Sequence, residues 1–298
     1  MQISKSKAVF LFSLVILIWG FNWTVVKLIV LEIPPVWSAA LRSAIAAAVV
    51  LPLQRATGDL RLPEKRDLSV ILCIGVFNMT LCPLFMAAGL ELVPVGRSVV
   101  LGYTTPLWVA PGAWLFLREP LPLRRLLGVA AGLCGIAILC NPSTLDWGDS
   151  RAVLGYVFLL LSALSWAVAI LCIRRHVWRA TPFQLLFWQT LLASVLLILL
   201  ALSVHGPLSF YPSLSLLLLL AYCGIPGTAL AFWALTVINA SLPATTVSLG
   251  LLATPLVGIL GSVVFLDEGV DLSMAVSIFL VLGGIALGSS RQGREKSG

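Results

Sequence analysis

Long apolar stretches, separated by short polar segments, run from one end of the chain to the other. They are continuously apolar rather than alternating, which favours membrane helices over the strands of a transmembrane barrel. A bilayer core of about 30 Å needs roughly 20 helical residues to cross it, and ten stretches of about that length occur. They comprise residues 8–31, 34–53, 68–90, 95–117, 123–140, 152–173, 182–204, 214–237, 242–266 and 272–289. The pattern therefore predicts an all-α polytopic membrane protein with ten transmembrane helices.

The first stretch, 8–31, follows Lys5 and Lys7, as the apolar core of a signal peptide would. It is longer than such a core, and no small-x-small cleavage site ends it. We therefore expect it to be retained as the first helix.

Composition supports a lipid environment. Charged residues make up 10% of the chain and hydrophobic residues 60%, and the mean hydropathy is +1.06. A soluble domain carries roughly 25% charged residues because its surface must be hydrated. A chain of 298 residues with so few charges must present apolar side chains to lipid, so the bilayer is its first expected partner.

The net charge of +7 is distributed in short clusters between the apolar stretches. It does not form the single basic patch that binds nucleic acid, so nucleic acid is not an expected partner. With the N-terminus in the cytoplasm, 15 of the 19 Lys and Arg residues lie on the inner side. The positive-inside rule then places both termini in the cytoplasm and requires an even number of crossings. The expected location is the cell inner (plasma) membrane.

The six cysteines all lie within apolar stretches, and only two histidines occur in the chain. No pair of cysteines has the spacing of a metal site, and a lone cysteine in an apolar segment behaves as a small hydrophobic side chain. The sequence therefore predicts no metal, no cofactor and no disulfide.

Two segments 149 residues apart resemble each other. Residues 105–119 and 254–268 share Thr, Pro, Leu, Gly, Phe, Leu and Glu at seven of 15 aligned positions. Other landmarks recur in the same order at nearly the same offset: Trp19 and Lys27 match Trp166 and Arg174, Pro35 matches Pro182, and Pro94 matches Pro243. The chain is therefore predicted to hold two five-helix units, residues 1–147 and 148–298, which together form one transport unit.

Because each unit holds an odd number of helices, the second unit is inserted upside down relative to the first. Inverted repeats recur in secondary carriers, where two similar halves exchange conformations. This organisation indicates a carrier of a small molecule. It leaves the oligomeric state open, and a monomer is compatible with it.

These features together resemble the drug/metabolite transporter superfamily, in its ten-helix, twin-repeat, EamA-type branch. The resemblance covers residues 8–289 and rests on the two halves, Trp19-Gly20 in the first helix, the Thr-Pro-Leu of the fourth and ninth helices, and the closing Glu119 and Glu268. Within that branch the chain is most similar to exporters of aromatic amino acids. The resemblance implies a central cavity walled by both halves and the export of neutral or aromatic amino acids.

Prolines inside the apolar stretches mark expected kinks. Each removes one backbone donor and bends the helix, and the freed carbonyl needs a partner in lipid. Pro106 frees the carbonyl of Gly102, and Pro255 that of Leu251. The expected hinge positions are Pro83, Pro106, Pro226 and Pro255.

Polar and aromatic side chains at midplane depth are the candidate substrate contacts. They are Trp19, Asn22, Asn78, Tyr103, Thr104, Trp108, Trp166, Trp188, Tyr222, Trp233 and Ser248. A tryptophan in a helical bundle also packs as core, so each one has an alternative structural role. Trp178 lies near a segment end, as an interfacial belt residue does. The set as a whole suits an apolar pocket for a flat or bulky substrate.

Arg42 lies about eight residues into the second stretch, and an intramembrane Arg is a functional candidate by default. The matching position of the second half carries Gln189, which favours a polar contact between helices instead. Both roles remain open. No Asp or Glu lies deep in any stretch, so an uncoupled, facilitative carrier is expected. The alternative is a proton-coupled exporter of amphipathic drugs or other metabolites.

Two other classes fit less well. A membrane enzyme would need a buried nucleophile, carboxylate pair or metal cluster, and the sequence offers none. A receptor or scaffold would need large loops outside the membrane. We therefore predict that the chain is not an enzyme.

Overall fold

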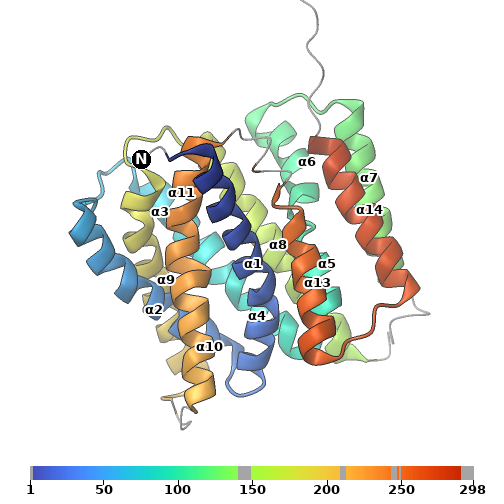
Figure 1. The fold of residues 1–298 in the computed structure, drawn as a ribbon, viewed down its shortest axis with the longest axis horizontal. Coiled ribbons are helices and arrows are strands. Elements are labelled where there is room, and N and C mark those ends of the chain that lie inside the picture. Colours follow the sequence, from blue (N-terminus) through green and yellow to red (C-terminus); the bar gives the residue numbers. More distant parts are fainter. Residues whose placement is uncertain (1–2, 140–148, 209–212, 243–246, 248–249, 290–298) are drawn as a thin grey trace, which may run out of the picture.

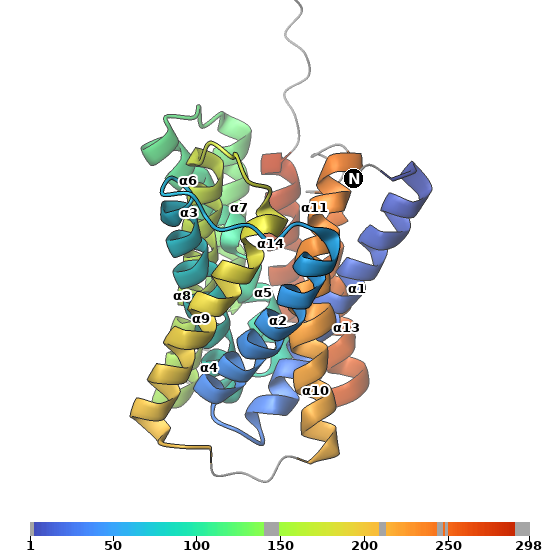
Figure 2. The same cartoon turned by 90° about the vertical axis from the view of Figure 1, so that its left-hand side faces the viewer.

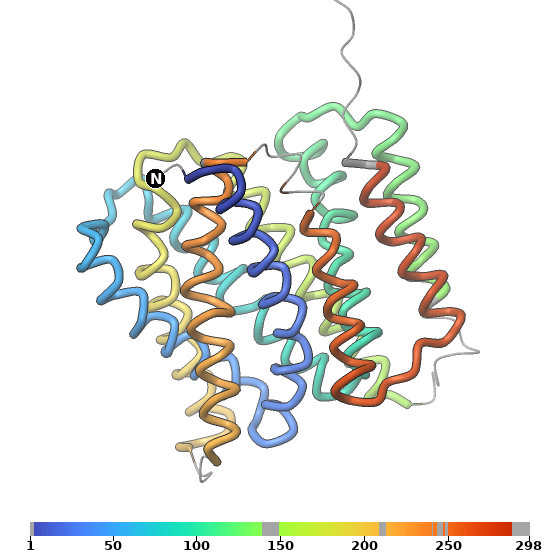
Figure 3. Tube along the Cα trace, in the orientation of Figure 1, coloured from blue at the N-terminus to red at the C-terminus, as the bar shows by residue number. Residues whose placement is uncertain are grey.

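The computed structural model describes residues 3–139, 149–208, 213–242, 247 and 250–289. Within these ranges the chain forms helices and the turns between them, with no strand, so the prediction of an all-helical fold is confirmed. The helices run side by side in one bundle (Figure 1). The start of α1 (Lys5–Val30) and the end of α14 (Leu272–Ser289) lie at the same end of that bundle (Figure 3).

The first half contains five helical segments, two of which are interrupted. After α1 come α2 (Pro35–Thr57), the continuous run of α3 (Leu68–Cys73), η1 (Ile74–Leu81) and α4 (Cys82–Leu92), then α5 (Val95–Gly102) and α6 (Thr105–Leu117), and finally α7 (Leu123–Leu139). The segment η1 is a π-helix, which is a wider turn that often marks a functional region.

The second half follows the same order. It holds α8 (Ser150–Arg175), α9 (Pro182–His205), the run of α10 (Leu214–Gly224), η2 (Ile225–Leu230) and α11 (Ala231–Ser241), then α13 (Ala253–Leu266) and α14. The segment η2 is again a π-helix. Part of the ninth expected stretch, 242–266, lies outside the described residues.

Seven helices of the described chain are long and apolar enough to cross a membrane. They are Lys5–Val30, Pro35–Thr57, Leu68–Leu92, Val95–Leu117, Ser150–Arg175, Pro182–His205 and Leu214–Asn239, and two shorter apolar helices are Ala253–Leu266 and Leu272–Leu287. Large apolar side chains such as Phe10 (73% exposed) and Phe279 (76%) face outward, whereas Ser98, Thr104 and Ser277 are fully buried. This reversal of the soluble pattern is what a lipid-facing surface requires.

The halves interlock rather than sitting apart. The helix α2 packs against α9 (Figure 2), α4 against α8, α1 against α13, and α7 against α14 at one edge of the bundle (Figure 1). Glycines allow the closest of these approaches. A side chain at Gly20 would overlap Val257 of α13, and small residues at such crossings are the usual device of membrane helices.

Several local geometries recur in both halves at an offset of 148 or 149 residues. The second helix of each half ends at a glycine with positive φ, Gly58 (72°) and Gly206 (71°). The fourth ends at a left-handed non-glycine residue, Arg118 (55°), and Asp267 (53°) is its counterpart. In each π-helix a threonine hydroxyl donates 2.8 Å to the carbonyl five residues earlier, Thr80 to Gly75 and Thr228 to Cys223.

The four expected kink prolines all lie close to the start of a helical segment. Pro83 is the second residue of α4, Pro106 of α6 and Pro226 of η2, and Pro255 is the third residue of α13. The Gly102 carbonyl accepts a hydrogen bond from the Thr105 hydroxyl (3.1 Å), so this carbonyl is satisfied locally. A hinge role for these prolines stays a prediction.

The prediction of no disulfide is wrong for one pair. Cys73, the last residue of α3, is bonded to Cys172 near the end of α8, with the two Cα atoms 6.6 Å apart. The pair is 99 residues apart in the sequence, and only the packing of α3 on α8 brings it together. Sequence spacing carries no information on such a contact. Cys82, Cys134 and Cys223 are free thiols, and Cys140 lies outside the described residues.

Candidate substrate cavity

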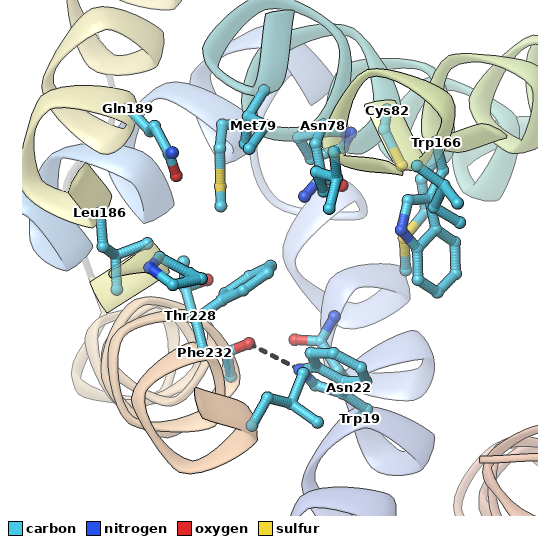
Figure 4. Close-up of a pocket in the computed structure, with 18 of the residues that line it drawn as sticks. Trp19, Asn22, Asn78, Met79, Cys82, Trp166, Leu186, Gln189, Thr228 and Phe232 are labelled. Carbon is cyan, nitrogen blue, oxygen red and sulfur yellow. Dashed lines mark hydrogen bonds between the residues drawn. The ribbon is translucent and has the colours of Figure 1, made fainter. Parts of the chain in front are cut away.

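A cavity of about 620 Å³ lies between the two halves. Its walls come from α1, α2, η1, α4 and α5 of the first half and from α8, α9, η2 and α11 of the second. Figure 4 shows side chains converging on it from both halves, with Asn78 and Trp166 across the space from Trp19. A volume of this size suits a small organic molecule.

Most of the described lining is aromatic or aliphatic, with scattered neutral polar groups. The polar members are Asn22, Asn78, Ser162, Gln189, Thr228, Thr236 and Asn239, and Arg42 is the only charged one. Four tryptophans contribute, Trp19, Trp23, Trp166 and Trp178.

Five of the predicted contact residues line the cavity: Trp19, Asn22, Asn78, Tyr103 and Trp166. The Trp19 indole N–H donates 3.1 Å to the carbonyl of Gly227 in η2, which fixes the ring (Figure 4). Tyr103 bridges two other rings, with its centroid 6.0 Å from Trp23 and 6.4 Å from Trp166. The aromatic wall is therefore held by contacts across helices.

The structure places three other predicted residues away from the cavity, each with its polar group occupied. The Thr104 hydroxyl donates 2.6 Å to the Leu101 carbonyl and accepts 3.3 Å from the Trp108 indole. The Trp188 indole donates 2.8 Å to the carbonyl of Arg61. These side chains stabilise helix ends and turns in this conformation.

Two more predicted contacts pack against neighbouring helices. The Tyr222 hydroxyl donates 2.9 Å to the Ile18 carbonyl of α1. Trp233 packs among apolar side chains of two buried clusters. Ser248 lies outside the described residues.

From the sequence, Arg42 could have either a functional role or a polar contact between helices. Both Arg42 and Gln189, at the matching position of the second half, line the cavity. Arg42 is the eighth residue of α2, and its Nε atom is buried without a hydrogen-bond partner in the described chain. The Nε2 atom of Gln189 on α9 is also buried and unpaired. The polar contact between helices that the sequence allowed for Arg42 is not formed with Gln189 here.

Other lining residues carried no distinctive signal in the sequence. Trp178, expected at the membrane interface, lines the cavity instead, with its indole N–H donating 3.3 Å to the Ile173 carbonyl. Trp23, Met79 and Phe232 are aromatic or aliphatic members of apolar helices. In helices that are hydrophobic on all sides, periodicity does not separate a cavity face from a lipid face.

A bundle of apolar helices around a central cavity defines the class of a polytopic membrane transporter. The profile of the EamA-like transporter family matches residues 6–141 and 153–290. The chain belongs to this family, and it is a transporter rather than an enzyme.

Relatives extend over nearly the whole chain. YvbV, an uncharacterized transporter of Bacillus subtilis, is 24% identical over 298 residues, covering 99% of this chain and 96% of its own. A probable amino-acid metabolite efflux pump of Salmonella typhimurium is 28% identical over 283 residues, covering 90% of this chain and 91% of its own. A solved crystal structure has the same fold, with a TM-score of 0.66, 23% identity and coverage of 95% of this chain and 96% of its own.

Proposed function

We propose that the chain exports neutral, above all aromatic, amino acids or closely related metabolites by alternating access. The observation that carries this proposal is the central cavity, whose wall combines tryptophan and tyrosine rings with amide and hydroxyl groups. Such a wall suits a flat side chain with a small polar head. Similar proteins in Salmonella typhimurium and Escherichia coli are named probable amino-acid metabolite efflux pumps.

The proposed architecture is ten crossings in two inverted five-helix repeats, residues 1–147 and 148–298. The family profile matches twice, once in each half. The paired left-handed residues and the paired threonine hydrogen bonds of η1 and η2 support the same division. In this arrangement both termini lie in the cytoplasm beside the inner membrane, at the end rich in Lys and Arg.

The proposed conformation is open toward the cytoplasm. The cavity reaches Ile173, Trp178 and Asn239, which lie at or near the helix ends on that side. A substrate would enter there and leave after the halves rearrange.

Contacts between the halves close the opposite end. The Glu268 carboxylate accepts hydrogen bonds from the Val95 (2.7 Å) and Gly96 (2.8 Å) amides at the start of α5. Arg97 forms an ion pair with Asp271 (3.1 Å). These bonds join first-half residues to second-half residues, so export requires them to break.

The proposed transport is uncoupled to protons. No carboxylate or imidazole is among the described residues that line the cavity, and proton-coupled carriers use such a group within the membrane. The alternative is a proton-coupled exporter of amphipathic drugs, and the apolar side chains of the same cavity wall favour it.

Counterflow in liposomes tests the proposal. Vesicles containing the purified protein are loaded with unlabelled phenylalanine and given labelled phenylalanine outside, without a proton gradient. We expect transient accumulation of label. Trp166→Ala should slow it by about two- to tenfold, because one aromatic contact is lost, and Trp166→Phe should have a smaller effect.

Trp114→Ala is the matched control, because Trp114 is 57% exposed on α6 and faces outward. It should transport like the wild type. Accumulation that needs an imposed proton gradient, or that occurs for an amphipathic cation and not for phenylalanine, would establish the alternative.

A further inference from the structure

Arg42 is the only charged residue among the described residues that line the cavity. It is the eighth residue of α2, about 12 Å along the helix at 1.5 Å per residue. An ionised side chain at that depth is retained only where it is paired, hydrated or functional. Its surroundings therefore decide its role.

The surroundings of Arg42 supply no counter-charge. The titratable groups that interact with its guanidinium are the thiols of Cys82 on α4 and Cys223 on α10. No carboxylate lines the cavity within the described chain, and none of the ion pairs formed there involves Arg42. Its Nε atom is buried without a hydrogen-bond partner.

Two neutral polar atoms on the cavity wall are also unpaired. The Asn22 Oδ1 atom on α1 can accept a hydrogen bond, and the Gln189 Nε2 atom on α9 can donate one. Buried polar atoms without partners are unfavourable in a finished core. A cavity wall with three such atoms is suited to a bound molecule that supplies the missing hydrogen-bond partners.

We propose that Arg42 binds the carboxylate of the transported molecule, and that the cargo class is aromatic monocarboxylates, of which aromatic amino acids are one case. This rests on the proposed function and narrows it. The planar guanidinium presents N–H groups in a fork that matches the two oxygens of a carboxylate. The indole rings of Trp19 and Trp166 then flank the aromatic part.

The cavity wall offers a positive charge to a carboxylate but no negative charge from its described residues to an ammonium. A carboxylate meets a full opposite charge at Arg42, whereas an ammonium meets only neutral acceptors such as the Asn22 Oδ1 atom. The carboxylate–guanidinium contact joins two opposite charges through two parallel hydrogen bonds, whereas the ammonium–amide contact has only one charged partner. Recognition should therefore depend on the carboxylate more than on the ammonium.

Direct binding to the purified full-length protein tests this with four compounds. Isothermal titration calorimetry compares phenylalanine, 3-phenylpropanoate (no ammonium), phenylalaninamide (no carboxylate) and phenethylamine (neither carboxylate nor amide). Each is titrated into wild type, Arg42→Gln, Arg42→Lys and the control Arg55→Gln. Arg55 lies on the same helix but is exposed and outside the cavity.

In the wild type and in Arg55→Gln we expect both carboxylates to bind about 10- to 100-fold more tightly than the amide and the amine. Arg42→Gln should remove most of that difference while remaining monodisperse and folded, and Arg42→Lys should retain part of it. Equal binding of acid and amide, unchanged discrimination in Arg42→Gln, or no binding of any of the four would each overturn the inference.

Two experimental outcomes distinguish a failure of the proposed role of Arg42 from a failure of the proposed amino-acid export. If phenylalanine shows counterflow and phenylalaninamide competes equally well, the carrier stands and the role of Arg42 falls. If 3-phenylpropanoate binds through Arg42 while phenylalanine shows no counterflow, the role of Arg42 stands and amino-acid export falls.

Discussion

Asp271, directly before α14, shows how a single side chain stabilises the closed end of the bundle. Its Oδ1 atom accepts hydrogen bonds from the Ser273 hydroxyl (2.7 Å) and the Met274 amide (2.6 Å). Its Oδ2 atom pairs with Arg97 (3.1 Å). These partners, the Ser273 hydroxyl foremost, hold the pKa of the Asp271 carboxyl below its usual range.

A carboxyl with a lowered folded pKa stabilises the protein above its unfolded pKa of about 3.9, and that contribution is lost as the pH falls through the folded value. We therefore expect Asp271→Asn to destabilise the protein by about 0.5–1 kcal/mol at pH 7, because the amide keeps the cap oxygen but loses the negative charge at the helix start and the ion pair with Arg97. The difference in unfolding free energy between the variant and the wild type should become smaller below about pH 3.9.

Thermal unfolding in detergent across that pH range measures this gap. The control is Glu64→Gln, whose exposed pairing with Arg179 spans 3.7 Å and should contribute little. A gap for Asp271→Asn that stays constant from pH 7 to the acid limit contradicts the account of this residue.

Among the elements, the α7–α14 pair shows a close contact at Gly284 of α14 and none at its neighbour Gly283. A side chain at Gly284 would overlap the carbonyl oxygen of Gly128 and lie 3.1 Å from the amide nitrogen of Gly132. A side chain at Gly283 would meet nothing within 4 Å. The two positions share a helix and an amino acid but differ in their surroundings.

Gly284→Ala should therefore lower the stability by about 1–3 kcal/mol, because the helices must move apart. Gly283→Ala should leave it unchanged or raise it by up to about 1 kcal/mol, because alanine favours the helix. Thermal unfolding of the two variants beside wild type decides the matter. Equal destabilisation by both would show that the close contact at Gly284 is not what holds the pair.

The helices could be predicted from the sequence more fully than the residues that line the cavity. Apolar length placed the helices well, because lipid requires about 20 apolar residues per crossing whatever the packing. It could not tell Trp166, on the cavity wall, from Trp233, which packs against two buried clusters, because both sit in helices that are apolar all round. The Cys73–Cys172 bond was missed for a related reason, since it depends on packing between helices 99 residues apart.

In the molecule as a whole, alternating access requires the two halves to exchange roles. Glu119 and Glu268 occupy matching positions, and so do Lys27 and Arg174. Glu119 pairs with Arg174 (3.1 Å), while the Lys27 ammonium donates to the Leu90 carbonyl (2.5 Å) near Glu268. Matching charged residues thus lie at opposite ends of the bundle, as the proposed inverted repeats would place them.

The proposed export requires the cargo to pass through the cavity between the halves. Ile170 on α8 lines that cavity, and Leu164 on the same helix is 42% exposed on the outer surface. Filling the cavity with Ile170→Trp should abolish passage without removing any polar contact. Placing the same side chain outside, in Leu164→Trp, should leave passage intact.

Phenylalanine counterflow through these two variants, each shown to be monodisperse, is the most direct measurement. We expect wild-type accumulation for Leu164→Trp and none for Ile170→Trp. Undiminished accumulation by Ile170→Trp would contradict it, because the cargo would then cross by another route.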